Sequence, residues 1–467
     1  MRHGGKKGSV SMNRMLLRKM KQIVGGGNVS VAAEDLICYG HDGTLVTARP
    51  DVVVHPASTA EVASLVEIAA AAGMPIVARG AGTGLSGGSI PVKGGLVLHF
   101  NRMNRLKRLD GREMLAVVEP GITNWALKQA AEAEGLFYPP DPGSFKVCTL
   151  GGNVAENAGG PRGVKYGVTG DYVIGLEGVI ASGEIIRTGG ETRRNVSGYD
   201  LTSLLVGSEG TLAVITEITV KLIPKPPARR TAIIAFEKLT DAGAADIAVD
   251  GQGFLPAALE IMDGTTIDCV ERYRPGHLPR NAAAILLIEV DGEEESVEHQ
   301  LRRLTGACEA SGGHLVGSAK NEEEAGELWE SRRSISAALG RIAPTKIGED
   351  ISLPRACIPE MLERLHQIGK KYELAIAAFG HAGDGNLHPN ILTDRRDPEK
   401  MRRTEAAISE LFAATLEMHG TLSGEHGIGM TKSRFLKGAI PRETLELMKG
   451  IKKVFDPEGV LNPGKIF

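Results

Sequence analysis

Two short segments in the C-terminal half combine glycines with side chains that bind metals and move protons. The first segment carries His381 and His388, and the second carries Glu425 and His426. Neutral imidazoles and a carboxylate suit zinc and related divalent ions. Three of these four side chains could hold one ion and leave the fourth free to move a proton. We therefore predict an active site that joins the two segments.

The histidine pair His381 and His388 differs from the other histidines in its surroundings. Glycines are dense in the segment that carries both residues, and we expect them to exclude the regular helix or strand on which a core histidine would lie. The remaining histidines that we considered are expected to be hydrogen-bonded structural groups: His41, His55, His99, His299 and His366.

Length and composition restrict the class of protein. A chain of 467 residues suggests two or three domains. A net charge of -3 and an aromatic content of 4% give no case for nucleic-acid binding. The 5 cysteines are scattered without a CxxC pair, which favours reduced intracellular thiols and argues against an iron–sulfur cluster in this chain.

The N-terminus is basic, but its apolar stretch is too short for a signal peptide. No run of apolar residues is long enough to span a bilayer. We expect a cytoplasmic protein, with any membrane association peripheral and made through a partner.

From about residue 51 the pattern alternates between strands and helices. Residues 51–54 and 76–78 are expected to be strands, and a capping box at 58–61 is expected to open a helix that runs to about Ala72. A glycine-rich loop at 79–88 follows the second strand. Its backbone N–H groups could bind a diphosphate, although the loop is not the GxGxxG turn of a Rossmann unit.

Two more glycine-rich stretches follow, at 140–160 and 207–212. Three such loops suggest an extended, phosphate-bearing ligand such as a dinucleotide. The linker 224–227 is rich in proline and indicates a domain boundary near residue 227. We expect an N-terminal helical extension (1–46), a first domain (47–226) and a second domain (227–467) whose tail, from about 420, returns to the first.

The chain resembles a known family in both halves. In the first half the resemblance lies in PDVVVHPASTAEV, VARGAGTGLSGG, PPDPGS, GGNVAENAGG and LLVGSEGTLAVITE, which are similar to the FAD-binding domain of the vanillyl-alcohol-oxidase/p-cresol-methylhydroxylase (PCMH) type. In the second half it lies in LWESRR, GHAGDGNLHPN, SGEHGIGMTK and FDPEGVLNPGK, which are similar to the FAD-linked oxidase C-terminal domain. Within this family the pattern is most similar to the group of glycolate oxidase flavin subunits, D-lactate dehydrogenases and D-2-hydroxyglutarate dehydrogenases.

The resemblance implies an α+β fold, in which a two-subdomain FAD-binding domain of the PCMH type carries a ferredoxin-like α+β cap over the flavin. It implies non-covalent FAD, because Thr83 and its neighbours offer no histidine for a covalent tether. The positions that match the family's FAD contacts are Arg79, Gly80, Ala81, Gly82, Thr83, Gly84, Gly87, Gly88, Pro140, Asp141, Gly143, Ser144, Gly151, Gly152, Asn153, Asn157, Gly159, Gly160, Glu209, Gly210, Ile215 and Asn462.

The second half matches the family's chemical residues. His381, His388 and Glu425 match the ligands of a divalent metal (zinc, manganese or iron), and His426 matches the catalytic base. The remaining matches concern the substrate: Arg332, Asn390 and, less directly, Lys346, because alignment on Ser352-Leu353-Pro354 puts the family's lysine nearer Gly348.

Together these matches imply oxidation of a 2-hydroxy acid, such as glycolate or D-lactate, to the 2-oxo acid by hydride transfer to flavin N5. The electrons would pass to an external acceptor: an iron–sulfur partner subunit, a quinone or an electron-transfer flavoprotein. A homodimer is compatible with the sequence. Two alternatives stay open, namely a metal-dependent hydrolase acting on a phosphorylated substrate and a non-catalytic FAD-binding subunit.

Overall fold

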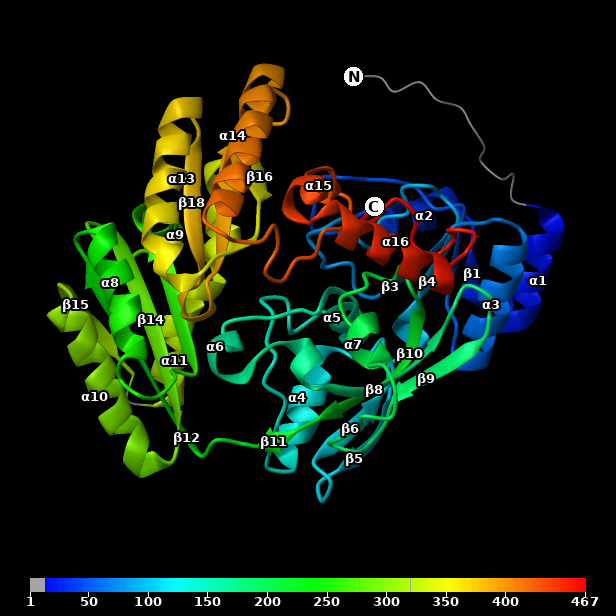
Figure 1. Ribbon diagram of the computed structural model, residues 1–467, viewed down its shortest axis with the longest axis horizontal. Coiled ribbons are helices and arrows are strands. Elements are labelled where there is room, and N and C mark those ends of the chain that lie inside the picture. The colour runs from blue at the N-terminus through cyan, green and yellow to red at the C-terminus, as the bar shows by residue number, and fades with distance from the viewer. Residues whose placement is uncertain (1–12, 277, 320) are drawn as a thin grey trace.

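The structure is a computed structural model that describes residues 13–276, 278–319 and 321–467. Residues 1–12 of the expected N-terminal extension lie outside this range. The described chain forms two groups of elements (Figure 1). Three smaller sheets use residues up to Pro224, and one large sheet begins at Ala228. Among the described residues, no helix combines the length and apolar character needed to cross a bilayer.

The first sheet has the order β1-β2-β4-β3 and is parallel except for β1. Its strands are β1 (Val29–Ser30), β2 (Val52–Val54), β3 (Ile76–Arg79) and β4 (Leu96–His99). Helix α3 (Thr59–Ala71) connects β2 to β3, and α1 (Arg14–Val24) packs on α3. Ser58 caps α3 by accepting a 3.2 Å hydrogen bond from the Glu61 N–H, as expected. The Glu61 carboxylate, however, accepts from the N–H of Ala57 rather than of Ser58.

The second sheet is antiparallel, with the order β5-β6-β10-β8-β9. Its strands are β5 (Leu106–Asp110), β6 (Leu115–Val118), β8 (Val173–Val179), β9 (Ile185–Gly189) and β10 (Val214–Lys221). A two-stranded sheet of β7 (Leu136–Phe137) and β11 (Ile223–Pro224) lies beside the linker. The helices of this half are α2 (Ala33–Cys38), α4 (Asn124–Ala133), α5 (Leu150–Glu156), α6 (Gly163–Tyr166) and α7 (Leu201–Leu205).

The large sheet is antiparallel throughout and has the order β15-β12-β14-β13-β18-β19-β16, with β17 also on β19. Its first four strands in the chain take the ferredoxin-like arrangement, with helices α8 and α10 as the crossovers. The strands are β12 (Ala228–Phe236), β13 (Ala258–Asp263), β14 (Ala284–Gly292), β15 (Gly313–Ser318), β16 (Thr345–Gly348), β17 (Ile351–Ser352), β18 (Ala375–His381) and β19 (Asn386–Thr393).

Helices cover both faces of the large sheet. Along β14, Leu286 and Ile288 enter one core, while Ile285 and Leu287 enter the other, as the two-residue period of a strand requires. The helices of this half are α8 (Leu239–Asp250), α9 (Gly264–Tyr273), α10 (Glu294–Ala310), α11 (Glu322–Arg333), α12 (Ile335–Ile342), α13 (Ile358–Tyr372) and α14 (Pro398–Glu417). Short 3-10 turns occur at Gly26–Asn28, Phe100–Arg102, Thr169–Asp171, Arg355–Cys357, Ala382–Asp384 and Ser433–Phe435.

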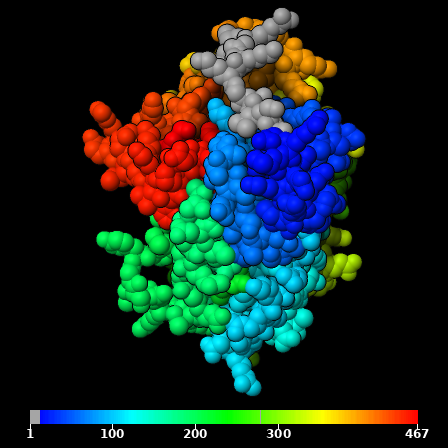
Figure 2. Space-filling view, turned by 90° about the vertical axis from the view of Figure 1, so that its right-hand side faces the viewer, coloured from blue at the N-terminus to red at the C-terminus, as the bar shows by residue number. Residues whose placement is uncertain are grey.

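The C-terminal segment lies on the first group of sheets. Helices α15 (Leu436–Ala439) and α16 (Arg442–Phe455) run in front of the first half in Figure 1. After α16 the chain forms a parallel bridge beside the start of β3, because the Ile76 N–H donates to the Val460 carbonyl and the Asn462 N–H donates to the Ile76 carbonyl, each at 2.8 Å. Figure 2 shows the C-terminal segment packed against the N-terminal segments.

Candidate active site

A cavity of about 1260 Å³ lies between the two groups of elements. Small-molecule sites usually occupy about 300–1,000 Å³, so this cavity is large enough for an extended ligand together with a small one. Most of the residues predicted to contact a cofactor line it: Arg79, Gly80, Ala81, Gly82, Thr83, Gly84, Gly88, Asp141, Gly143, Ser144, Gly151, Gly152, Asn153, Glu209, Gly210, Ile215 and Asn462.

The wall made by the 79–88 loop consists mainly of backbone. A Cβ added at Gly80 would lie 2.0 Å from Thr149 Oγ1, and one added at Gly88 would lie 2.6 Å from Glu156 Oε1. Gly82 has φ +71°, a conformation that side chains rarely adopt. Gly80 and Gly88 therefore have no room for a side chain, because the loop packs closely on the segment that carries Thr149 and Glu156.

Several buried polar atoms of residues that line the cavity have no hydrogen-bond partner within the described chain. They are Asn153 Nδ2, Asp141 Oδ1, Glu156 Oε2 and Asn462 Oδ1. Buried polar atoms are nearly always hydrogen-bonded, so these atoms indicate a polar ligand. The cradle of glycine backbone and the unpaired donors and acceptors fit a dinucleotide such as FAD.

Five of the predicted cofactor residues lie outside the cavity lining: Gly87, Pro140, Asn157, Gly159 and Gly160. Two of them have local structural contacts instead. Asn157 ends α5 in the left-handed conformation and accepts from the Gly170 N–H at 2.7 Å, and the Pro140 carbonyl accepts from Asn124. Gly159 packs against Glu425, since an added Cβ would lie 3.0 Å from Glu425 Oε2.

Both histidines of the 380–390 segment lie on strands, so the expectation that glycines exclude regular structure there is wrong. His381 ends β18, and His388 lies on the adjacent strand β19. The glycines instead allow the hairpin to form. A Cβ at Gly380 would lie 2.2 Å from the Asn386 carbonyl oxygen, and Gly385 turns the chain with φ +85°. The strand pair thereby holds both imidazoles rigidly on one side of the sheet.

His381, His388 and Glu425 converge on one point. The two imidazole Nε2 atoms are 3.4 Å apart, and Glu425 Oε1 lies 3.5 Å from His381 Nε2 and 3.4 Å from His388 Nε2. Ligands about 2.0–2.1 Å from a tetrahedral ion are separated by roughly 3.3–3.4 Å. The three ligand atoms therefore have the spacing that one divalent ion requires.

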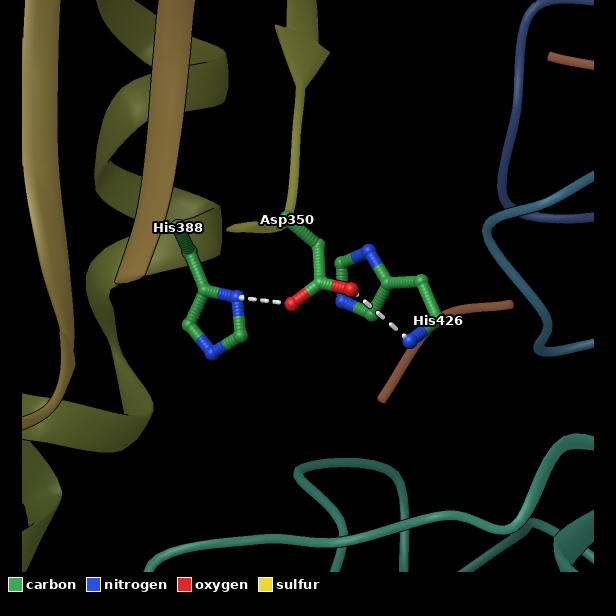
Figure 3. Close-up of side chains that lie close together, drawn as sticks. All are labelled: Asp350, His388 and His426. Atoms are coloured by element: carbon green, nitrogen blue, oxygen red, sulfur yellow. Dashed lines mark hydrogen bonds and ion pairs between the residues drawn. The ribbon is translucent and has the colours of Figure 1, made fainter. Parts of the chain in front are cut away.

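The outer nitrogens of both imidazoles face carboxylates. His381 Nδ1 lies 2.5 Å from Glu260 Oε1, and His388 Nδ1 lies 3.6 Å from Asp350 Oδ1 (Figure 3). The Glu260 hydrogen bond orients the His381 ring and favours the tautomer whose Nε2 is free. His388 Nδ1 lies beyond hydrogen-bond distance of Asp350 and has no partner in the described chain. Burial lowers the pKa of His388 to about 3, which also keeps its ring neutral. Burial acts the same way on His381, but the Glu260 carboxylate outweighs it and raises that pKa well above its usual value.

Asp350 holds the loop that carries Glu425 and His426. Its Oδ2 accepts hydrogen bonds from Ser423 Oγ at 2.5 Å and from the backbone N–H groups of residues 424, 425 and 426 at 2.9–3.1 Å. Lys432 Nζ lies 3.5 Å from the same oxygen. Burial alone would raise the pKa of Asp350, but Lys432 and the neighbouring histidines hold it well below its usual value. Asp350 is thus a buried, ionised anchor for the second segment.

His426 lies beside the triangle of ligand atoms. Its ring stacks on that of His388 with a centroid distance of 5.3 Å and an interplanar angle of 9°. Its Nδ1 is buried and has no hydrogen-bond partner in the described chain. Burial lowers the pKa of His426, which favours a neutral ring. A neutral imidazole with an unpaired nitrogen can accept a proton from a molecule bound in the cavity.

The residues predicted to contact substrate line the same cavity. Arg332 in the last turn of α11 lies over the Phe379 ring, 4.5 Å from its centroid. Lys346 donates to Ser336 Oγ at 2.7 Å, and burial lowers its pKa. Asn390 donates to the His388 carbonyl at 2.8 Å. Lys346 and Gly348 are alternate residues of β16, so both face the same side of the strand.

Three buried ionisable residues of the site were not predicted from the sequence: Glu260, Asp350 and Lys432. For Glu260 the available signal was an acidic residue inside an apolar strand, Leu259-Glu260-Ile261; Asp350 and Lys432 carried no comparable signal. A buried charge needs a partner, so such a residue indicates a nearby cation or polar site.

Comparison with known families agrees in both halves. Residues 50–189 match the family described as FAD binding domain, and residues 225–466 match the family described as FAD linked oxidases, C-terminal domain. The glycolate oxidase subunit GlcD of Bacillus subtilis is 44% identical over 447 residues, which cover 96% of this chain and 95% of that protein. The D-lactate dehydrogenase of Anaerostipes hadrus is 35% identical and covers 97% of both chains.

Solved structures agree on the fold. A p-cresol methylhydroxylase superposes with a TM-score of 0.80 at 20% identity, over 97% of this chain and 96% of the other. An alkyldihydroxyacetonephosphate synthase superposes with a TM-score of 0.76 at 18% identity, over 96% and 84%. The architecture is therefore the PCMH-type FAD-binding fold with an α+β second half, and the chain belongs to the FAD-linked oxidases, a family of flavoprotein oxidoreductases.

Proposed function

We propose that the protein oxidises a small 2-hydroxy acid, such as glycolate or D-lactate, to the 2-oxo acid. The observation that carries the proposal is the triangle of ligand atoms from His381, His388 and Glu425, beside an unpaired His426 nitrogen, in the same cavity as the glycine cradle. The relatives named glycolate oxidase subunit and D-lactate dehydrogenase support this substrate class.

Each protein group has a distinct role in this proposal. Arg332, with Lys346 and Asn390 nearby, binds the substrate carboxylate, since a guanidinium holds a carboxylate through two parallel hydrogen bonds. His381, His388 and Glu425 would hold a divalent ion, which would bind the 2-hydroxyl group. His426 accepts the hydroxyl proton, because its ring is neutral and its Nδ1 has no partner.

The bound groups supply the remaining chemistry. FAD, held without a covalent bond, supplies an acceptor for the two electrons and the Cα hydrogen. A divalent ion lowers the pKa of a hydroxyl group bound to it. We assign the cofactor-binding role to residues 47–226, the substrate role to residues 227–467 and the closing of the cavity to the tail from about 420.

Reduced flavin must pass its electrons to an external acceptor. The 5 cysteines of the chain are free thiols and do not form a cluster, so we propose that the acceptor is a separate subunit or a soluble carrier. The relative from Bacillus subtilis is named a subunit, which supports a partner protein.

The test is anaerobic titration of the FAD-loaded, metal-loaded protein with glycolate, D-lactate, L-lactate and D-2-hydroxyglutarate, with the flavin absorbance as the readout. We expect one of the D or achiral acids to bleach the oxidised-flavin band. The His426→Ala protein, if it retains flavin and metal, serves as the matched control and should bleach far more slowly. A flavin band that none of the acids bleaches would contradict the proposed substrate class.

The two alternatives make different predictions in the same experiment. A metal-dependent hydrolase would show no flavin band even after reconstitution, and membership of the FAD-linked oxidases counts against it. A non-catalytic FAD-binding subunit would keep an oxidised flavin with every acid, and the intact set of His381, His388, Glu425 and His426 counts against that role.

A further inference from the structure

We propose that Glu260 couples the metal site to the substrate-carboxylate site, acting as a positioning residue for both. The inference rests on the proposed function and adds a residue that neither the sequence motifs nor the cavity lining identify. Glu260 lies on β13, is fully buried and does not itself line the cavity.

Glu260 divides its two carboxylate oxygens between two donors. Its Oε1 lies 2.5 Å from His381 Nδ1, and its Oε2 accepts a hydrogen bond from Arg332 Nε at 2.5 Å. The first contact fixes the ring whose Nε2 belongs to the metal triangle. The second fixes the guanidinium proposed to hold the substrate carboxylate. One side chain therefore sets the distance between the two sites.

The register of the large sheet produces the first contact. Glu260 of β13 lies directly opposite His381 of β18, and Met262 lies opposite Phe379. Side chains directly opposite each other on an antiparallel pair lie on the same face. Phe379 in turn supports the Arg332 guanidinium from beneath, 4.5 Å from the ring centroid.

The second contact leaves Arg332 free to bind an anion. Glu260 contacts only the Nε atom of Arg332. Within the described chain, the two terminal nitrogens of Arg332 make no hydrogen bond or ion pair. A guanidinium held through Nε can still present both terminal N–H groups to a carboxylate. Glu260 thus orients Arg332 without occupying its substrate-binding edge.

An uncharged isostere cannot replace this carboxylate. Both neighbours of Glu260 are donors, and an ionised carboxylate accepts from both. The amide of Glu260→Gln has one acceptor oxygen and would present an N–H group to the second donor. The variant must therefore lose either the His381 contact or the Arg332 contact. Glu260→Asp keeps the charge but withdraws the oxygens by one methylene, so it should fail to span both partners.

The chain offers a matched control in Glu289, on the neighbouring strand β14. It is equally buried and also faces donors only, namely Trp329 Nε1 at 2.7 Å, Arg162 at 3.2 Å and Thr231 Oγ1 at 3.2 Å. Trp329 belongs to the same helix as Arg332. Glu289→Gln therefore creates a similar buried defect under α11 without touching a metal-site histidine.

The experiment uses FAD-loaded protein that has been stripped of metal and is titrated with Zn²⁺ against a chromophoric chelator. Loss of an outer carboxylate typically weakens a metal site about 10- to 100-fold, so we expect that increase in the Zn²⁺ dissociation constant for Glu260→Gln and Glu260→Asp. Glu289→Gln should bind Zn²⁺ with nearly the wild-type dissociation constant, because Glu289 contacts no residue of the metal triangle. At saturating Zn²⁺, KM for D-lactate and glycolate should still rise in the Glu260 variants, because Arg332 has lost its anchor.

Two results would overturn this inference and leave the proposed function standing. One is wild-type Zn²⁺ affinity in a folded, FAD-containing Glu260→Gln protein. The other is an equal loss in Glu289→Gln, which would make the role of Glu260 merely structural. A wild-type protein that binds no Zn²⁺, Mn²⁺ or Fe²⁺ would instead overturn the proposed metal site and the inference with it. Flavin content and the thermal unfolding of each variant show whether it is folded.

Discussion

Asp350 and Glu349 are neighbouring buried carboxylates, and we predict that neutralising them has opposite effects. Both oxygens of Asp350 accept hydrogen bonds, Oδ1 from Asn386 and Oδ2 from four donors, so the N–H group of Asp350→Asn must face a donor on one side. The variant also removes the negative charge that lies 3.5 Å from Lys432 Nζ. Breaking a buried ion pair by removing one partner costs about 3–5 kcal/mol, a large share of the roughly 5–15 kcal/mol that stabilises a domain. We expect the free energy of unfolding to fall by about 3–5 kcal/mol.

Glu349 accepts no hydrogen bond within the described chain, and burial raises its pKa from 4.5 to about 7. A carboxyl group with a raised folded-state pKa contributes stability below its unfolded pKa, and this contribution is lost as the pH rises through the folded pKa. The shift from 4.5 to about 7 corresponds to about 3 kcal/mol at pH 8 as an upper limit. Glu349→Gln should therefore stabilise the protein by about 1–3 kcal/mol at pH 8 and have little effect at pH 5.

The assay is urea denaturation of both variants and the wild type at pH 5 and pH 8, followed by far-UV circular dichroism. A chelator is present throughout, so that metal binding does not contribute. Equal shifts of the urea midpoint for the two variants, or a destabilised Glu349→Gln protein at pH 8, would refute the reasoning from hydrogen-bond partners and burial.

Three further predictions concern the active site. His426→Ala should lower turnover about 100- to 10,000-fold while flavin and metal are retained, and near-normal turnover would exclude His426 as the base. Removing metal with a chelator should abolish turnover, leave the flavin band in place and be reversed by Zn²⁺ or Mn²⁺; full activity of the stripped protein would contradict a metal role. Gly82→Ala should weaken FAD binding at least about tenfold, because the residue has φ +71° and its Cβ would lie 2.1 Å from an Arg79 nitrogen. Gly111→Ala, at an exposed turn with nothing within 4 Å, is its control and should bind FAD normally.

The sequence was sufficient to predict that the segment with His381 and His388 meets the segment with Glu425 and His426 at one site. His381 and His388 are only 7 residues apart, and Glu425 and His426 are adjacent, so short-range spacing pointed to both pairs. The β2–α3–β3 unit was also predictable, because its cap and its apolar periodicity are local features.

The supporting residues depend on long-range pairing and could not be predicted in this way. Glu260 meets His381 across 121 positions, and Asp350 meets the Ser423 hydroxyl across 73. These contacts follow from strand order and register, which a single sequence does not reveal. The strands at His381 and His388 were missed for a related reason: the glycines that suggest a loop are those that allow two strands and a turn to approach closely.

The contacts of Asn462 have a consequence for how the protein is made. Its side-chain amide donates to the carbonyls of Gly88 and Glu209, which lie 374 and 253 positions earlier in the chain. The ribosome therefore synthesises the whole large-sheet half before Asn462, which contacts both glycine-rich loops of the first half, becomes available. Domains usually fold in order as they emerge during synthesis, but this arrangement delays closure of the first half. A fragment ending near residue 226 should lack one wall of the cradle, so the two halves are separable in the sequence but interdependent during maturation.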